Sequence, residues 1–237
     1  MGTDRYTAPP EALGVRRGPG PPTLRDCLHA WLRRPSPPLL LGAVLLAAVL
    51  RAVQDPLGWR DAVVAAGVLL VTPPAEWAIH VYVLHSRPLR VAGRRIELLS
   101  TREHRAHHQA PAELDRVLLN RLAVAASLPL IAGVIYALSF PVALGLGGDR
   151  LSGASTALLV SWSVLAAYEW VHFLIHTPYR PRSRAYRAIW RNHRLHHYKN
   201  ERYWFGVTST FGDRMMGTLR DPRSVPKSRT ARTLRGA

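Results

Sequence analysis

Long apolar segments alternate with arginine-rich stretches along the chain. Residues 122–148 contain no charged side chain, residues 151–175 contain only Glu169, and residues 62–84 contain only Glu76. A helix needs roughly 20 mostly apolar residues to cross the hydrocarbon core of a bilayer. All three segments are long enough, so they predict transmembrane helices.

A fourth apolar run, Leu39–Leu50, is shorter and reaches Val53 only if Arg51 is included. A run of this length fits a tilted span, a half-buried helix or the apolar part of a targeting signal. We interpret it as the first span because it leads directly into the second. Four helices buried in a soluble core are the alternative, which fits these lengths poorly. The sequence therefore predicts an all-α integral membrane protein with four transmembrane helices, at 39–53, 62–84, 122–141 and 154–175.

Most basic residues lie outside the predicted spans, in the two terminal segments and the two large loops. The formal net charge is +17, and 28 of the 32 lysines and arginines fall in residues 1–38, 86–116 and 177–237. Short loops rich in lysine and arginine stay in the cytoplasm, so both termini and both large loops are predicted to be cytoplasmic. Anionic lipid headgroups then explain the charge, and no nucleic acid is expected as a partner.

The two ends of the chain differ in composition from the middle. Residues 1–38 and 221–237 are basic and poor in long apolar runs, and we expect both to be disordered tails. The segment between them, 39–220, is predicted to be the membrane domain that carries the chemistry. The single cysteine, Cys27, excludes an internal disulfide framework.

Clustered histidines give the strongest indication of function. Ten of the eleven histidines fall in four clusters, which form the same pattern twice. Each half has a Glu-Trp dipeptide and two histidines at the end of a predicted span, followed by an HxxHH motif in the next loop. The ten are His80, His85, His104, His107, His108, His172, His176, His193, His196 and His197.

Spacing on a helix decides which imidazoles can meet. Residues at i, i+3 and i+4 lie within an arc of about 100°. Each HxxHH motif can therefore direct three imidazoles to one place, and His172 and His176 share a face. His80 and His85 lie about 140° apart on a regular helix. They require a broken turn, for which two prolines just upstream give a reason, or they bind different ions.

Imidazole is the commonest protein ligand for metal ions. Ten imidazoles are too many for one ion, so the sequence predicts two. Imidazole suits iron, zinc, copper and nickel alike, and the residues by themselves do not choose among these metals.

Three carboxylates are candidates for orienting the imidazoles. Glu76 and Glu169 lie at the membrane ends of two spans, where a carboxylate usually has a function, and Asp115 follows the first HxxHH motif. Each is expected to accept the outer N–H of a ligating imidazole; the alternative is a carboxylate in contact with water. Trp77 and Trp170 are interpreted as interfacial anchors.

The order of these motifs resembles that of the fatty acid hydroxylase and sterol desaturase superfamily, and it is most similar to the fatty acid 2-hydroxylase type. The resemblance covers about residues 60–220. It is carried by HxxxxH at 80–85, HxxHH at 104–108, HxxxH at 172–176, HxxHH at 193–197, and the stretches 196–208 and 211–218.

This resemblance implies a four-helix membrane scaffold with a cytoplasmic helical cap that holds a dimetal site, with all ten histidines as ligands. It implies two iron ions (zinc is possible in the purified protein) and O₂ as cofactors. The implied reaction inserts a hydroxyl group into the acyl chain of a fatty acid or membrane lipid. The N-terminal segment has no heme-binding pattern of the kind found in relatives with a fused cytochrome b5, so a separate electron-transfer protein is expected as the donor.

Side chains after the last histidines are candidates for binding the substrate. Lys199 and Arg202 are candidates for contacting an anionic headgroup, although a solvated basic face is the simpler explanation. Four aromatic residues either line the entrance for the acyl chain or lie in the membrane interface: Tyr198, Tyr203, Trp204 and Phe205.

The histidine motifs are compatible with more than one reaction. The same metal centre can desaturate a sterol or hydroxylate a carotenoid ring, and the motifs do not separate these reactions from acyl hydroxylation. Two non-redox alternatives fit less well. A zinc hydrolase needs an HExxH motif, which this sequence lacks, and a membrane metal-binding or transport protein would place its ligands along the spans near the midplane.

Overall fold

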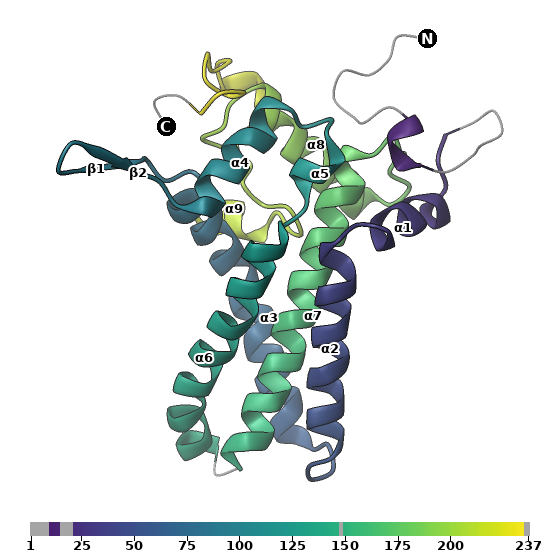
Figure 1. Ribbon diagram of the computed structural model, residues 1–237, viewed down its shortest axis with the longest axis vertical. Helices are drawn as coiled ribbons and strands as arrows, with labels where there is room; N and C mark the ends of the chain where they lie inside the picture. The colour runs from purple at the N-terminus through teal and green to yellow at the C-terminus, as the bar shows by residue number, and fades with distance from the viewer. Residues whose placement is uncertain (1–9, 15–20, 147–148, 235–237) are drawn as a thin grey trace. The chain divides into compact units, whose positions relative to one another are not determined.

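The computed structural model describes residues 10–14, 21–146 and 149–234, and these are mostly helical (Figure 1). They divide into two compact units. The first unit contains the residues up to Arg33 together with 73–118 and 170–237, and the second contains 34–72 and 119–169.

Long helices form the second unit. They are α2 (Ser36–Ala52), the first part of α3 (Trp59–Ile79), α6 (Arg121–Leu146) and most of α7 (Arg150–His176). Their buried core is small and centres on Leu40, Val124 and Ala166. Many other apolar side chains point outward, such as Leu70 and Leu130, which are 69% and 67% exposed. An apolar exterior of this extent is typical of a surface that faces lipid.

Three helices are long and apolar enough to cross a membrane: Trp59–Leu84, Leu114–Ser139 and Arg150–His176. They coincide with three of the predicted spans. Helix α1 (Leu24–Leu32) and α2 pass the same test only as a pair, and they are bent by 87° at their junction. The expected first span, 39–53, lies almost entirely within α2, and the total of four spans stays a prediction.

An ion pair that the sequence did not predict joins α2 to α3 in the second unit. Arg51 is 3% exposed, and its Nε and Nη2 donate to the two carboxylate oxygens of Asp61 at 2.9 and 2.8 Å. The hydroxyl of Thr156 on α7 also donates to Asp61. In the sequence Arg51 interrupts an apolar run, and its partner is not apparent from spacing alone.

Short helices, a hairpin and loops form the first unit. Cys27, Trp31, Phe173, Leu174 and Tyr179 belong to its buried core. Its elements are the turn η1 (Pro10–Leu13), α1, the end of α3, the π-helix η2 (His80–Leu84), β1 (Leu89–Val91), β2 (Arg94–Ile96), α4 (Leu99–Gln109), α5 (Leu114–Val117), the end of α7, α8 (Arg184–Tyr198), α9 (Phe211–Met215) and the turn η3 (Pro222–Ser224).

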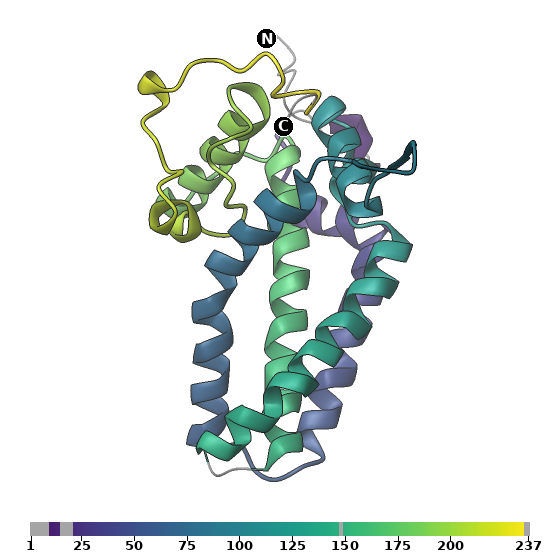
Figure 2. The same ribbon diagram turned by 90° about the vertical axis from the view of Figure 1, so that its left-hand side faces the viewer.

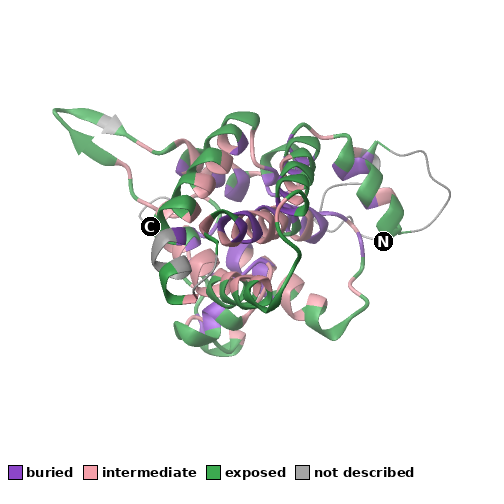
Figure 3. Ribbon diagram, turned by 90° about the horizontal axis from the view of Figure 1, so that it is seen from below, coloured by how far each residue is buried: buried purple, intermediate pink, exposed green. Residues whose placement is uncertain are grey.

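Strands β1 and β2 form an antiparallel hairpin in which Leu89 pairs with Ile96. The two residues at its tip, Ala92 and Gly93, have φ angles of 49° and 77°. Positive φ at both central residues is the requirement of the tight turn that matches the twist of a hairpin. Figure 3 shows the hairpin as exposed at every residue for which burial is described.

The expectation of disorder is wrong for the described parts of both tails. Residues 24–32 form α1, which begins with a capping box between Thr23 and Asp26. The helix buries Cys27, Ala30 and Trp31. These residues stand at i, i+3 and i+4, which is the apolar spacing of a helix with one buried face. Val225, Ala231 and Leu234 of the C-terminal segment are also buried. Residues 1–9, 15–20 and 235–237 lie outside the described residues.

The buried ion pair predicts a specific loss of stability. Asp61→Asn replaces one acceptor oxygen with a donor that faces the Arg51 guanidinium, so the free energy of unfolding should fall by about 1–3 kcal/mol. Thermal unfolding in detergent measures the change. Asp55→Asn is the matched control, because the Asp55 side chain is 60% exposed and its ionic contact with Arg51 is 3.8 Å long. Equal melting temperatures for the two variants would contradict the prediction.

Candidate metal centre

Ten histidines of the first unit form two groups of five. In each group, one ring nitrogen from every member lies within 4.8 Å of the others. All ten are buried except His85, which is half-buried. The first group is His80, His85, His104, His108 and His196. The second group is His107, His172, His176, His193 and His197.

A π-helical turn brings His80 and His85 into the same group. The backbone N–H of His85 donates to the carbonyl of His80 at 3.0 Å, which is the i to i+5 bond of a π-helix. The wider turn removes the separation of about 140° that a regular helix would impose, and the ring centroids lie 5.0 Å apart. Of the two alternatives that the sequence left open, the structure shows the irregular turn.

The two HxxHH motifs are divided between the groups. On α4, His104 and His108 belong to the first group and His107 to the second. On α8 the middle histidine, His196, again belongs to the opposite group from the other two. The expectation that all three imidazoles of a motif meet is wrong. Position i+4 lies about 40° to one side of position i on a helix, whereas i+3 lies about 60° to the other side.

The contacts in the first group cannot be a hydrogen-bond network. The Nε2 of His104 lies 3.1 Å from the Nε2 atoms of His80, His85 and His108. A ring nitrogen of imidazole carries either one N–H or one lone pair, so it cannot satisfy three such contacts. With metal–nitrogen bonds of about 2.1 Å, nitrogens at neighbouring positions on one ion lie about 3 Å apart. The arrangement therefore fits a metal ion.

Backbone carbonyls fix the tautomer of three histidines in the first group. Each accepts a hydrogen bond from an imidazole Nδ1, which leaves Nε2 with the free lone pair that a metal requires. The pairs are His80 with Phe205 at 2.6 Å, His196 with Tyr203 at 2.9 Å and His108 with Ala231 at 2.8 Å.

The second group contains buried ring nitrogens whose hydrogen-bonding capacity is not met. Among the described residues, neither ring nitrogen of His107 has a hydrogen-bond partner. The Nε2 of His193 lies 3.1 Å from that of His172 and 2.9 Å from that of His197, again more contacts than one ring nitrogen can satisfy. A buried polar atom left without a partner costs about 1–3 kcal/mol, and a bound ion would remove this cost for the ring nitrogen that it binds.

Burial keeps the imidazoles neutral, which is the form that binds metal. Burial, and then the neighbouring imidazoles, lower the pKa of His104, His107 and His193 well below the usual 6.5. Burial also lowers the pKa of His108 to about 3.

Two carboxylates hold the loop 203–208 in place. Glu76 accepts hydrogen bonds from the N–H groups of Val207 and Thr208 and from the Thr208 hydroxyl. Asp213 accepts from the N–H groups of Phe205 and Gly206 at 2.9 and 2.8 Å. Because this loop supplies the carbonyls for two imidazoles, both carboxylates act on the site through the loop.

The predicted direct contact between Glu76 and an imidazole is therefore wrong, and the sequence missed the role of Asp213. Gly206 is the residue in the sequence that marks this tightly folded loop. A Cβ at this position would lie 2.0 Å from the Ser209 carbonyl oxygen, so only glycine fits. Glu169 belongs to the second unit, where its Oε1 accepts the N–H of Leu119 at 3.0 Å. Asp115 is exposed on α5. Their roles as partners of imidazoles stay predictions.

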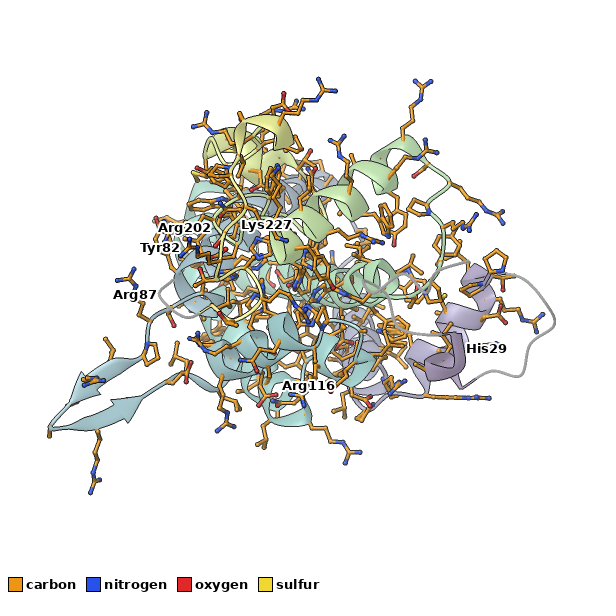
Figure 4. All side chains as sticks on the ribbon, turned by 90° about the horizontal axis from the view of Figure 1, so that it is seen from above. His29, Tyr82, Arg87, Arg116, Arg202 and Lys227 are labelled. Atoms are coloured by element: carbon orange, nitrogen blue, oxygen red, sulfur yellow. The ribbon has the colours of Figure 1, made fainter. Side chains whose placement is uncertain are left out.

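A pocket of about 400 Å³ opens beside the first group. The ring of Phe205 on its wall lies 5.6 Å from that of His85, and Trp77 Nε1 donates to the Thr218 hydroxyl at 2.9 Å. Both Trp77 and Thr218 line the pocket. Figure 4 shows Tyr82, Arg87 and Arg202 on one side of the first unit, while His29 lies elsewhere, on α1. The lining residues are Trp77, Val81, His85, Arg87, Glu201, Arg202, Phe205 and Thr218.

The four aromatic residues predicted to bind substrate have different surroundings. Phe205 lines the pocket. Tyr203 contributes its carbonyl to His196, and Trp204 is fully buried with its Nε1 donating to the Arg220 carbonyl at 3.0 Å. Tyr198 is half-buried at the end of α8, with its ring 6.1 Å from that of His197.

Trp170, interpreted from the sequence as an interfacial anchor, packs edge-to-face on Trp31, with the ring centroids 5.5 Å apart.

Neutral buried imidazoles predict that the metal-free chain loses stability in acid. An imidazole in the unfolded chain binds a proton near pH 6.5, whereas His108 does so only at about 3 in the fold. Between these values the unfolded state holds more protons, so the free energy of unfolding falls as the pH is lowered from 6.5 toward 3. Each such histidine contributes up to about 1.4 kcal/mol per pH unit.

Thermal unfolding of the metal-free protein in detergent, from about pH 8 to about pH 5, measures this dependence. His108→Ala removes the contribution of one such histidine and should make the slope shallower. A melting temperature that is constant over this range would contradict the prediction.

Comparisons with known proteins agree with this geometry. The sequence model of the family described as fatty acid hydroxylase matches residues 65–218. The fold is similar to the solved structure of full-length Scs7p, in which only the hydroxylase domain is visible. That match has 21% sequence identity and a TM-score of 0.60, and it covers 88% of this chain and 70% of that chain. The comparison with curated proteins gave no significant match. The family match spans more than half of the chain and contains all ten grouped histidines, so the chain belongs to the fatty acid hydroxylase family.

Proposed function

We propose that this protein is an O₂-dependent di-iron hydroxylase that inserts a hydroxyl group into the acyl chain of a fatty acid or membrane lipid. The observation that carries the proposal is the convergence of ring nitrogens from ten histidines, nine of them buried, on two points in one unit. Membership of the family supports lipid hydroxylation in general. The metal, the number of ions and the use of O₂ belong to the proposal.

Each group of five histidines is proposed to bind one ion. The first group would hold one ion and the second group the other. The ring centroids of His108 and His197, from different groups, lie only 4.1 Å apart, so the two sites adjoin. Two iron ions would supply the capacity to activate O₂ for attack on an unactivated C–H bond. Zinc does not change its oxidation state, so a zinc-filled protein would be inactive.

The pocket beside the first group is the proposed entrance for the acyl chain. Val81, Phe205 and Trp77 offer apolar surface next to His85, one of the proposed ligands. Arg87 and Arg202 are exposed at the same pocket. Their charge suits the polar end of a lipid at the membrane interface, while the apolar wall guides its chain toward the ions and excludes water.

The arrangement in the membrane and the electron donor are also part of the proposal. The distribution of basic residues favours a cytoplasmic location for both termini and for the metal site. The segment 39–220, with four spans, would form the membrane hydroxylase domain. A separate electron-transfer protein would deliver the electrons that O₂ activation consumes.

Two alternatives remain to be separated by experiment. The same centre could desaturate a sterol or hydroxylate a carotenoid ring, since these substrates are also apolar and membrane-bound. A membrane metal-binding or transport protein would bind ions without consuming O₂.

Substitution of one histidine from each group tests the proposal. His196→Ala and His107→Ala should each lower the metal content of the purified protein by about one ion and abolish product formation, because each removes one of five ligands from a different group. Metal analysis of anaerobically purified protein and mass spectrometry of lipid extracts from expressing cells measure both effects. His29→Ala should change neither.

The mass change identifies the reaction. A gain of one oxygen atom indicates hydroxylation, whereas loss of two hydrogen atoms indicates desaturation. Two bound ions without O₂ consumption, when iron, a reductant and lipid are supplied, would favour the binding or transport protein. Turnover retained by either histidine variant would remove that residue from the proposed site.

A further inference from the structure

We infer that the C-terminal segment 225–234, here called the strap, positions His108 as a ligand of the ion in the first group. The inference rests on the proposed metal site and extends it to a part of the chain beyond residues 65–218, which the family model matches. Figure 2 shows this segment, in yellow, passing from the side of α8 across to α4, two helices of the first unit.

The contact that carries the inference joins the strap to an imidazole. The carbonyl of Ala231 accepts a hydrogen bond from His108 Nδ1 at 2.8 Å, and both residues are buried, at 3% and 0% exposure. This bond keeps the proton on Nδ1 and the lone pair on Nε2. Without the acceptor, a neutral His108 either leaves a buried N–H unpaired or moves the proton to Nε2, where it blocks metal binding.

The strap is anchored at both ends, so the Ala231 carbonyl is held in place. At its start, the N–H of Ser228 donates to the Lys199 carbonyl at 2.7 Å, and the Thr230 hydroxyl donates to Glu201 Oε1 at 2.6 Å. These bonds attach it to the segment that follows α8.

At its end, the strap is attached to the helix that carries His108. The guanidinium of Arg105 donates to the Leu234 carbonyl at 2.5 Å, and that of Arg232 donates to the Gln109 carbonyl at 3.2 Å. Val225 and Leu234, 5% and 2% exposed, anchor the two ends by burial. The strap thereby spans the two helices that contain the HxxHH motifs.

The geometry makes the expected effect selective. The hydrogen bond that carries the inference joins the strap to His108, which belongs to the first group. Loss of the strap should therefore weaken one ion and spare the other. A segment that only stabilised the fold would affect both ions together.

Truncation of the full chain provides the test. A chain that ends at Ser224 should bind one of its two ions about 10–100-fold more weakly, the usual effect of losing the partner of a ligating histidine. A chain that ends at Leu234 should bind both as the full chain does. Titration of metal-free protein with Co²⁺, followed by its visible absorption, separates the two sites, and circular dichroism with gel filtration in detergent verifies the fold.

Two further variants show whether the strap acts through His108. In the full chain, His108→Ala should weaken the same ion, and combining it with truncation at Ser224 should add no further loss. If the truncated chain does not fold, Thr230→Val is used instead. It removes the hydrogen bond to Glu201 and should weaken the same ion by a smaller factor, whereas Thr230→Ser should behave as the full chain.

The outcomes separate this inference from the proposed function. If the full chain binds no pair of ions, the proposed metal site fails. If the full chain binds two ions and the chain ending at Ser224 binds both equally well, the strap inference fails alone. Equal weakening of both ions in a folded truncated chain also overturns it.

Discussion

The structure of the first unit depends on keeping ten imidazoles, nine of them buried, within reach of one another. A ring nitrogen makes a single hydrogen bond, yet the Nε2 of His104 has three neighbouring ring nitrogens at 3.1 Å. An apolar core would not gather such groups, and a hydrogen-bond network could not satisfy them. The two metal ions that we propose would satisfy them, and folding and metal binding would then be coupled, as in other proteins whose ligands come from several elements.

Exchange of one histidine between the halves of the repeat ties the two sites together. The first group takes His196 from the second HxxHH motif, and the second group takes His107 from the first. Helices α4 and α8 consequently each contribute to both sites. The distance between the two proposed sites is therefore set by how these two helices lie relative to each other. The two halves of the sequence repeat therefore do not form one site each. Each site takes four histidines from one half and one histidine from the other.

Much of the site could be predicted from the sequence because its ligands are side chains at helical spacing. All ten grouped histidines, three of the apolar helices and the broken turn at His80 were accessible in this way. The division of each HxxHH motif was not, because the i+3 and i+4 positions lie on either side of position i and only tertiary packing decides which partner each meets. Arg51 and Asp61 illustrate the same limit, since their pairing depends on how α2 and α3 pack.

The groups that orient the imidazoles escaped prediction for a more general reason. The carbonyls of Tyr203, Phe205 and Ala231 belong to the backbone, so no residue type marks them. Carboxylates were expected in this role, but Glu76 and Asp213 instead bind the N–H groups of the loop that presents two of the carbonyls. A neutral carbonyl fixes the tautomer without adding a negative charge to the buried site. Such support depends on the path of the chain, and for this reason the residue types of the C-terminal segment do not reveal that its backbone orients His108.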